Sequence, residues 1–117
     1  MANDRDRPTT PPGEAAATPF DPAILRQQTG GNRDLERDVL TLFLGSGRDD
    51  VAQLRAAKTA EERRRIAHRL VGAAGAVGAL RMARLAASVE RSDAPVMPEL
   101  QAALAEATEA ITQYLAE

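Results

Sequence analysis

Apolar residues recur every three or four positions along most of this chain, which is the period of an α-helix with one buried face. No stretch alternates apolar and polar residues with period two, and the β-branched and aromatic residues that favour strands are sparse. Short connections between long amphipathic helices favour antiparallel neighbours. The sequence therefore predicts an all-α fold, an up-down antiparallel four-helix bundle with a short extra N-terminal helix.

Capping and helix-breaking residues predict where the helices begin and end. Asp21 can cap a short first helix with Pro22 at its first position, and this helix should end before Gly30. The fourth helix should end at Ser92-Asp93-Ala94-Pro95. The last helix is expected from about Val96 to Tyr114.

The second helix should begin after Asn32, whose side chain can cap it. Its apolar stripe is predicted to contain Leu35, Val39, Leu42 and Phe43. The side chains predicted to face water are Asp34, Glu36, Arg37 and Asp38. Because Gly45-Ser46-Gly47 interrupts this helix, we expect a kink or a break there.

The composition of the chain indicates how many domains it forms and which classes of partner it does not bind. Residues 1–19 hold four of the seven prolines without periodicity, so we expect a disordered N-terminal arm before a single domain at residues 20–117. The chain has no cysteine, no apolar leader segment and no apolar run long enough to span a bilayer, so we expect a cytoplasmic protein that binds no membrane. A net charge of −2 and three aromatic residues argue against a nucleic-acid partner.

The only histidine of the chain, His68, is predicted to stand near the middle of the third helix, which Thr59-Ala60-Glu61-Glu62 starts as a capping box. On a helix, His68 lies roughly 160° from both Ile66 and Leu70, so a core-facing stripe through those two residues turns the imidazole to solvent. The residues expected on the face of His68 are Arg64, Arg65, Val71, Gly72 and Gly75. Glycine inside a helix costs about 1 kcal/mol relative to alanine, so we interpret the two glycines as clearance for a partner that approaches the ring.

These residues resemble a known family. Ala67-His68-Arg69-Leu70-Val71-Gly72, followed by Gly78-Ala79 and by a helix that ends near Glu90, is similar to the histidine-containing phosphotransfer (Hpt) domain of two-component phosphorelay signalling. The likeness extends upstream through Phe20-Asp21-Pro22 and the Gly30-Gly31-Asn32 turn, and so covers about residues 20 to 92.

The resemblance implies a four-helix bundle in which His68 accepts a phosphoryl group from an aspartyl phosphate on a response-regulator receiver domain and passes it to another. Receiver domains, a hybrid histidine kinase, or both would be the partners of a monomeric chain. Mg²⁺ and the acidic pocket belong to the receiver in that family, so the chain would need no cofactor of its own. It would be a phosphocarrier without kinase activity, which agrees with the absence of any nucleophile triad or nucleotide-binding glycine loop in the sequence.

One position departs from the family pattern, because Val71 stands where a lysine usually faces the phosphoryl group. Arg64, Arg65 and Arg69 lie within one turn of His68 and are the candidate replacement cations. The alternative is that these arginines form only a solvated basic face paired with nearby glutamates. Val71 is also a candidate extension of an apolar docking patch.

Three other functions stay open at this point. The chain could be an adaptor that binds receivers but transfers phosphate poorly, as Val71 would allow. It could be the histidine-bearing helix pair of a sensor kinase, although that form needs an attached nucleotide-binding domain and typically has an acidic residue where Arg69 stands. The plainest alternative is a helical scaffold.

Overall fold

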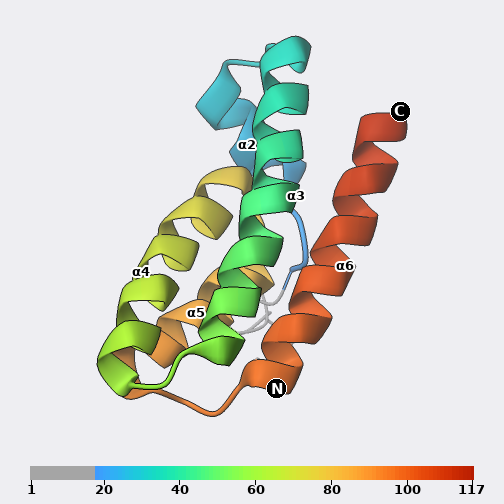
Figure 1. Cartoon of the computed structure of the whole chain (residues 1–117). Coiled ribbons are helices and arrows are strands. Elements are labelled where there is room, and N and C mark those ends of the chain that lie inside the picture. Colours follow the sequence, from blue (N-terminus) through green and yellow to red (C-terminus); the bar gives the residue numbers. More distant parts are fainter. Residues whose placement is uncertain (1–17) are drawn as a thin grey trace, which may run out of the picture.

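The computed structural model describes residues 18–117, and Figure 1 shows that this range consists of helices joined by short connections. The helices are α2 (Pro22–Thr29), α3 (Arg33–Ala56), α4 (Ala60–Val77), α5 (Leu80–Ser92) and α6 (Met97–Ala116). No residue of the described range lies in a strand. The predicted all-α bundle with a short extra N-terminal helix is therefore confirmed. Most of the expected N-terminal arm, residues 1–17, lies outside the described residues.

The four long helices form an up-down bundle in which each packs against its neighbours in sequence, and α6 closes the ring against α3 (Figure 1). The short α2 packs on α3 and α4 at one end of the bundle. The core is aliphatic and rich in alanine, which allows the helices to approach closely. Its largest fully buried hydrophobic side chains are Leu25, Leu40, Leu70, Met82, Leu100 and Ile111.

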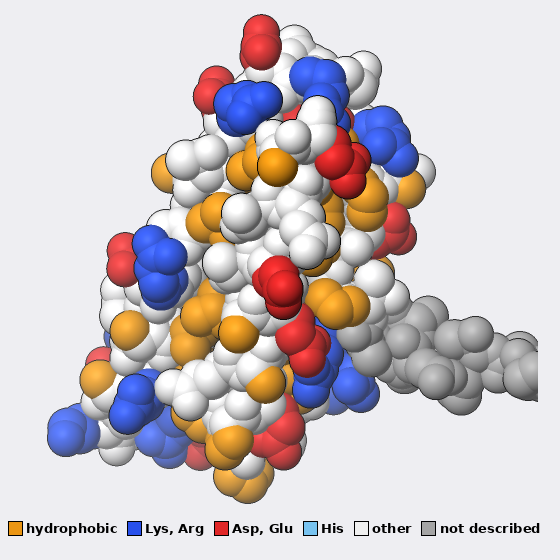
Figure 2. Space-filling model, turned by 90° about the vertical axis from the view of Figure 1, so that its right-hand side faces the viewer, with side chains coloured by type: hydrophobic (Ala, Val, Ile, Leu, Met, Phe, Trp, Pro, Cys, Tyr) orange, Lys and Arg blue, Asp and Glu red, His pale blue; other side chains and the backbone are white. Residues whose placement is uncertain are grey.

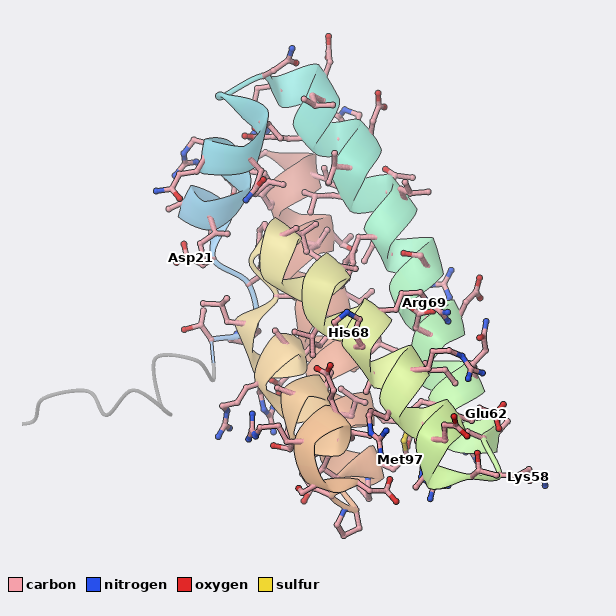
Figure 3. All side chains as sticks on the ribbon, turned by 90° about the vertical axis from the view of Figure 1, so that its left-hand side faces the viewer. Asp21, Lys58, Glu62, His68, Arg69 and Met97 are labelled. Carbon is pink, nitrogen blue, oxygen red and sulfur yellow. The ribbon has the colours of Figure 1, made fainter. Side chains whose placement is uncertain are left out.

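The helix starts follow the predicted caps. Asp21, Asn32 and Thr59 each accept a hydrogen bond from a backbone N–H in the first turn of the helix that follows. Glu62 completes the cap of α4 by accepting from the backbone N–H of Lys58, at 3.1 Å, and both residues lie at the start of α4 in Figure 3. Each cap satisfies an amide that the helix itself leaves without a partner, which explains why these starts could be predicted.

The turn between α4 and α5 is tied to the segment that precedes α2. Gly78 ends α4 with φ of +91°, in the left-handed region that favours glycine. Its carbonyl oxygen accepts from the N–H of Asp21 at 2.9 Å, and the carbonyl oxygen of Thr18 accepts from the N–H of Arg81 at 2.9 Å. No side chain caps α5, so the Thr18 carbonyl provides the acceptor for a backbone N–H in the first turn of α5.

The helix α3 is continuous through Gly45-Ser46-Gly47, so of the expected kink or break, the break does not occur. Gly47 is buried, and a Cβ placed there would lie 3.4 Å from the ring of Phe43. That distance is an ordinary van der Waals contact, so Gly47 packs against an aromatic ring one turn earlier on the same helix.

The buried face of α3 is rotated from the predicted one. Leu35 is 43% exposed and Leu42 is 73% exposed, whereas Leu40 and Phe43 are in the core. The buried residues of α3 are Glu36, Leu40, Phe43, Gly47, Asp50, Val51 and Leu54. The outer apolar row of Leu35, Val39 and Leu42 ends before Ser46, whereas the buried row continues to Leu54. Of the four residues of the predicted stripe, only Phe43 is buried in the core and Val39 is half-buried, so the predicted stripe lies largely on the wrong side of the helix.

Glu36 is 1% exposed, so the prediction that it faces water is wrong. Its carboxylate accepts a hydrogen bond from the Tyr114 hydroxyl at 2.6 Å, from the Thr29 hydroxyl at 3.3 Å and from Arg33 Nη1 at 3.3 Å. The Arg33 guanidinium also lies 4.8 Å from the centre of the Tyr114 ring. A buried carboxylate needs such partners, and these connect the last turns of α6 to α2 and α3.

Replacing Tyr114 with phenylalanine should lower the free energy of unfolding by about 2 kcal/mol at neutral pH, because Glu36 loses its shortest hydrogen bond while staying buried. The bond to Glu36 and burial raise the pKa of Tyr114 above its ordinary value of 10. The folded chain thus holds this proton more tightly, and the resulting stability is lost as the pH rises above about 10. Chemical denaturation of both proteins at neutral and alkaline pH should show their difference in stability shrinking at high pH. A constant difference would contradict this assignment.

Candidate functional site

His68 lies in the middle of α4, and its side chain is 77% exposed. The adjacent Ala67 and the stripe residues Ile66 and Leu70 are buried, so the prediction that the imidazole points to solvent is confirmed. Figure 2 shows the side of the molecule next to α6, where no histidine is visible, and Figure 3 shows His68 on the opposite side. The ring therefore stands on a regular, well-packed helix where a large partner can reach it.

Glu90 of α5 orients the ring, since its Oε2 lies 2.6 Å from His68 Nδ1. A carboxylate can only accept, so Nδ1 carries the proton and the neutral ring has its lone pair on Nε2. In the sequence resemblance, Glu90 marks only the end of a helix. Its contact with His68 joins residues 22 positions apart and follows from the packing of α4 on α5, which local sequence patterns do not reveal.

A shallow hollow of about 300 Å³ lies beside the ring. Its lining residues are Glu61, Arg64, Arg65, His68 and Glu90. The hollow lies over the turn that precedes His68, which is where a helical side chain leans. The structure thus brings two of the three candidate arginines to the imidazole. We call this feature the His68 hollow.

Arg69 is placed elsewhere, because its guanidinium turns toward α3 (Figure 3). Its Nε and Nη2 donate to Asp50 Oδ1 at 3.1 and 2.8 Å, and Nη2 also donates to Gln53 Oε1 at 3.1 Å. The hydrogen bonds and charge of Asp50 raise the pKa of Arg69 above its usual value. Asp50 is buried, so Arg69 compensates a carboxylate inside the bundle and links α4 to α3.

Beyond the ring, α4 carries the remaining predicted site residues. Val71 is half-buried and packs against the core, Gly72 is exposed, and Gly75 is half-buried. A Cβ added at Gly72 or Gly75 would meet no atom within 4 Å. The fold itself therefore does not require glycine at either position, in contrast to Gly78.

A sequence model of the Hpt domain matches residues 38–114, which is more than half of the chain and includes His68 and Glu90. The chain belongs to the Hpt domain family. Hpt domains serve histidine phosphotransfer in two-component phosphorelays, as phosphocarriers and not as kinases, and they interact with receiver and kinase domains. Comparisons with curated proteins and with solved structures returned no match.

Among residues 18–117, no helix is long and apolar enough to cross a membrane. The same residues contain no group of three or more histidine, aspartate or glutamate side chains placed to hold a metal ion.

Proposed function

We propose that His68 relays a phosphoryl group between the aspartates of response-regulator receiver domains. The observation that carries this proposal is an exposed imidazole whose Nδ1 is held by Glu90 at 2.6 Å, so that Nε2 is the nucleophilic atom. The Nε2 lone pair attacks phosphorus, a P–N bond forms, and the P–O bond to the donor aspartate breaks to release its carboxylate. The reverse steps pass the group to the next receiver.

Transfer needs the imidazole to reach the aspartyl phosphate in line, so the surface around it must admit another domain. Gly72 and Gly75 support such an approach because no side chain projects from α4 at those positions. In this proposal the receiver supplies Mg²⁺, and the chain has no cofactor of its own. The chain acts as a monomer in the cytoplasm, where its receivers and a hybrid histidine kinase are the expected partners.

An apolar groove between α3 and α4 supports contact with the receiver beyond the ring. Its lining residues are Val39, Leu42, Phe43, Ser46, Ala73, Ala76 and Val77. Ala73 and Ala76 follow Gly72 and Gly75 directly along α4, and the exposed Leu42 stands on the other wall. Burial of a leucine and of small side chains by a partner would favour binding.

The proposal is tested with receivers of the source organism that carry labelled aspartyl phosphate. Wild-type protein should acquire a label that is stable to alkali and labile to acid, and fragment analysis should locate it on His68. The variant His68→Gln should stay unlabelled although circular dichroism shows an unchanged helical content. Label on another residue, or none on the wild type with any receiver, would refute the relay.

A second candidate function is a receiver-binding adaptor that transfers phosphate weakly or not at all. The neutral, half-buried Val71 favours it, since it offers no charge to a phosphoryl group. The two functions differ in one measurement, because an adaptor would bind receivers in calorimetry while His68 remained unlabelled.

Replacing Gly72 with alanine should raise the free energy of unfolding by about 1 kcal/mol, because alanine has the higher helix propensity and the fold has room for its Cβ. The same methyl group would obstruct the receiver, so we expect transfer to His68 to slow by about tenfold, roughly the effect of 1.4 kcal/mol. Gly45→Ala is a matched control, since it lies inside α3 with no atom within 4 Å of an added Cβ. It should stabilise similarly without slowing transfer. Equal transfer rates for the wild type, Gly72→Ala and Gly45→Ala would show that the missing side chain at Gly72 does not help the receiver to approach.

A further inference from the structure

The arginines near His68 divide into two pairs with different surroundings. Arg63 donates to both carboxylate oxygens of Asp93, which follows the last residue of α5, at 2.7 and 2.9 Å, and Arg69 is held by Asp50 on α3. Both therefore neutralise carboxylates that connect α4 to its neighbours. Within the described residues, Arg64 and Arg65 make no ion pair, and both line the His68 hollow.

A phosphoryl group on His68 would introduce up to two negative charges at this surface, and such a group is stabilised by guanidinium donors. Val71 carries no charge, and Arg69 could turn to the phosphoryl group only by leaving the buried Asp50 without its partner. We propose that Arg64 and Arg65 hold the phosphoryl group over the His68 hollow, as positioning residues that stabilise the phosphorylated form. This inference rests on the proposed role of His68 as the phosphoacceptor.

The arrangement of charges around the hollow gives the proposal a measurable consequence. Arg64, Arg65 and Glu61 project from α4, and Glu90 projects from α5. The two arginines favour the doubly ionised phosphoryl group and so lower its pKa, whereas the two glutamates raise it. Removal of the arginines should therefore raise the pKa of the phosphoryl group, and this pKa reports on the hollow without any receiver present.

The experiment phosphorylates the full chain with phosphoramidate. The Nε2 lone pair attacks phosphorus, the P–N bond of the reagent breaks, and ammonia leaves with the proton that it gains from water. Phosphorus NMR then gives the pKa of the phosphoryl group in the wild type, Arg64→Gln, Arg65→Gln and the double variant. We expect that pKa to rise by about 0.5 in each single variant and by about 1 in the double variant, a modest effect because the site is exposed.

Two variants serve as controls. Arg48→Gln removes an exposed arginine from α3 and should leave the phosphoryl pKa unchanged. Arg69→Gln removes an arginine next to His68 in sequence but also the partner of the buried Asp50, so it is compared only where circular dichroism shows the wild-type helical content, and there it too should leave this pKa unchanged. A phosphorylated His68 whose pKa is the same in the wild type and the double variant would overturn the inference and leave the phosphoacceptor role intact. A pKa that moves only in Arg69→Gln would also overturn it. A wild type that takes no phosphoryl group at His68 would instead refute the proposed function.

Discussion

Replacing Glu90 with alanine should slow phosphoryl transfer to His68 by about 10- to 100-fold, the range that loss of a hydrogen-bonded orienting partner produces for metal-binding histidines. Glu90 Oε2 lies 2.6 Å from Nδ1 and selects the tautomer that has its lone pair on Nε2. Without this acceptor the exposed ring would rotate and would divide between two tautomers. Rapid-quench measurement of transfer from a labelled receiver gives the rate. Calorimetry should show nearly unchanged receiver binding.

Glu90→Gln separates orientation from charge. The glutamine side chain can still accept from Nδ1–H through its amide oxygen, so this variant should recover most of the transfer rate that alanine loses. If Glu90 only stabilised the fold, variants of equal thermal stability would transfer at equal rates. Fast transfer by Glu90→Gln and slow transfer by Glu90→Ala at equal thermal stability would therefore exclude a purely structural role. If glutamine is as slow as alanine, the carboxylate charge matters more than the direction of the ring.

The features that the sequence predicted correctly depend on residues close together in the chain. Asp21, Asn32 and Thr59 each bond an amide within three positions, so their caps were visible as spacing. The exposure of His68 followed from the rotation of about 100° per residue relative to Ile66 and Leu70. Both kinds of inference need only the geometry of one helix.

The errors concern relations between helices. Glu36 sits among charged residues in the sequence, and the hydroxyl that accounts for its burial belongs to Tyr114, 78 positions later. On α3 the predicted stripe runs through Leu35 and Leu42, whereas packing against α4 and α6 places Leu40 inside and leaves Leu42 outside. The periodicity of one helix cannot choose between two such faces.

In the candidate site, too, the sequence predicted what depends on one helix and missed what depends on contacts between helices. The sequence places Arg64, Arg65 and Arg69 within one turn of His68, with Arg64 and Arg65 on its face, but it does not show what holds Arg69. In the structure the buried carboxylate of Asp50 on α3 engages Arg69. The importance of Glu90 likewise became visible only once α5 was placed against α4.

Replacing Gly78 with alanine should destabilise the protein by about 3 to 4 kcal/mol. Left-handed backbone costs a residue with a Cβ about 1–2 kcal/mol, and φ at Gly78 is +91°. In addition, a Cβ at this position would clash with the backbone carbonyl of Asp21, so the segment before α2 would have to move. That movement strains the hydrogen bond from the Asp21 N–H to the Gly78 carbonyl, and the burial of α2 against α4 depends on the same segment.

Gly31→Ala provides the matched control, because its φ is +83° but an added Cβ there would meet nothing within 4 Å. It should cost only the backbone strain, about 1–2 kcal/mol, so the difference between the two variants measures the contact with Asp21. Denaturant unfolding followed by circular dichroism gives both values. Equal decreases in the free energy of unfolding of the two variants would mean that the segment before α2 can move without an energetic cost. A larger loss in Gly78→Ala would show that this segment constrains the α4–α5 turn.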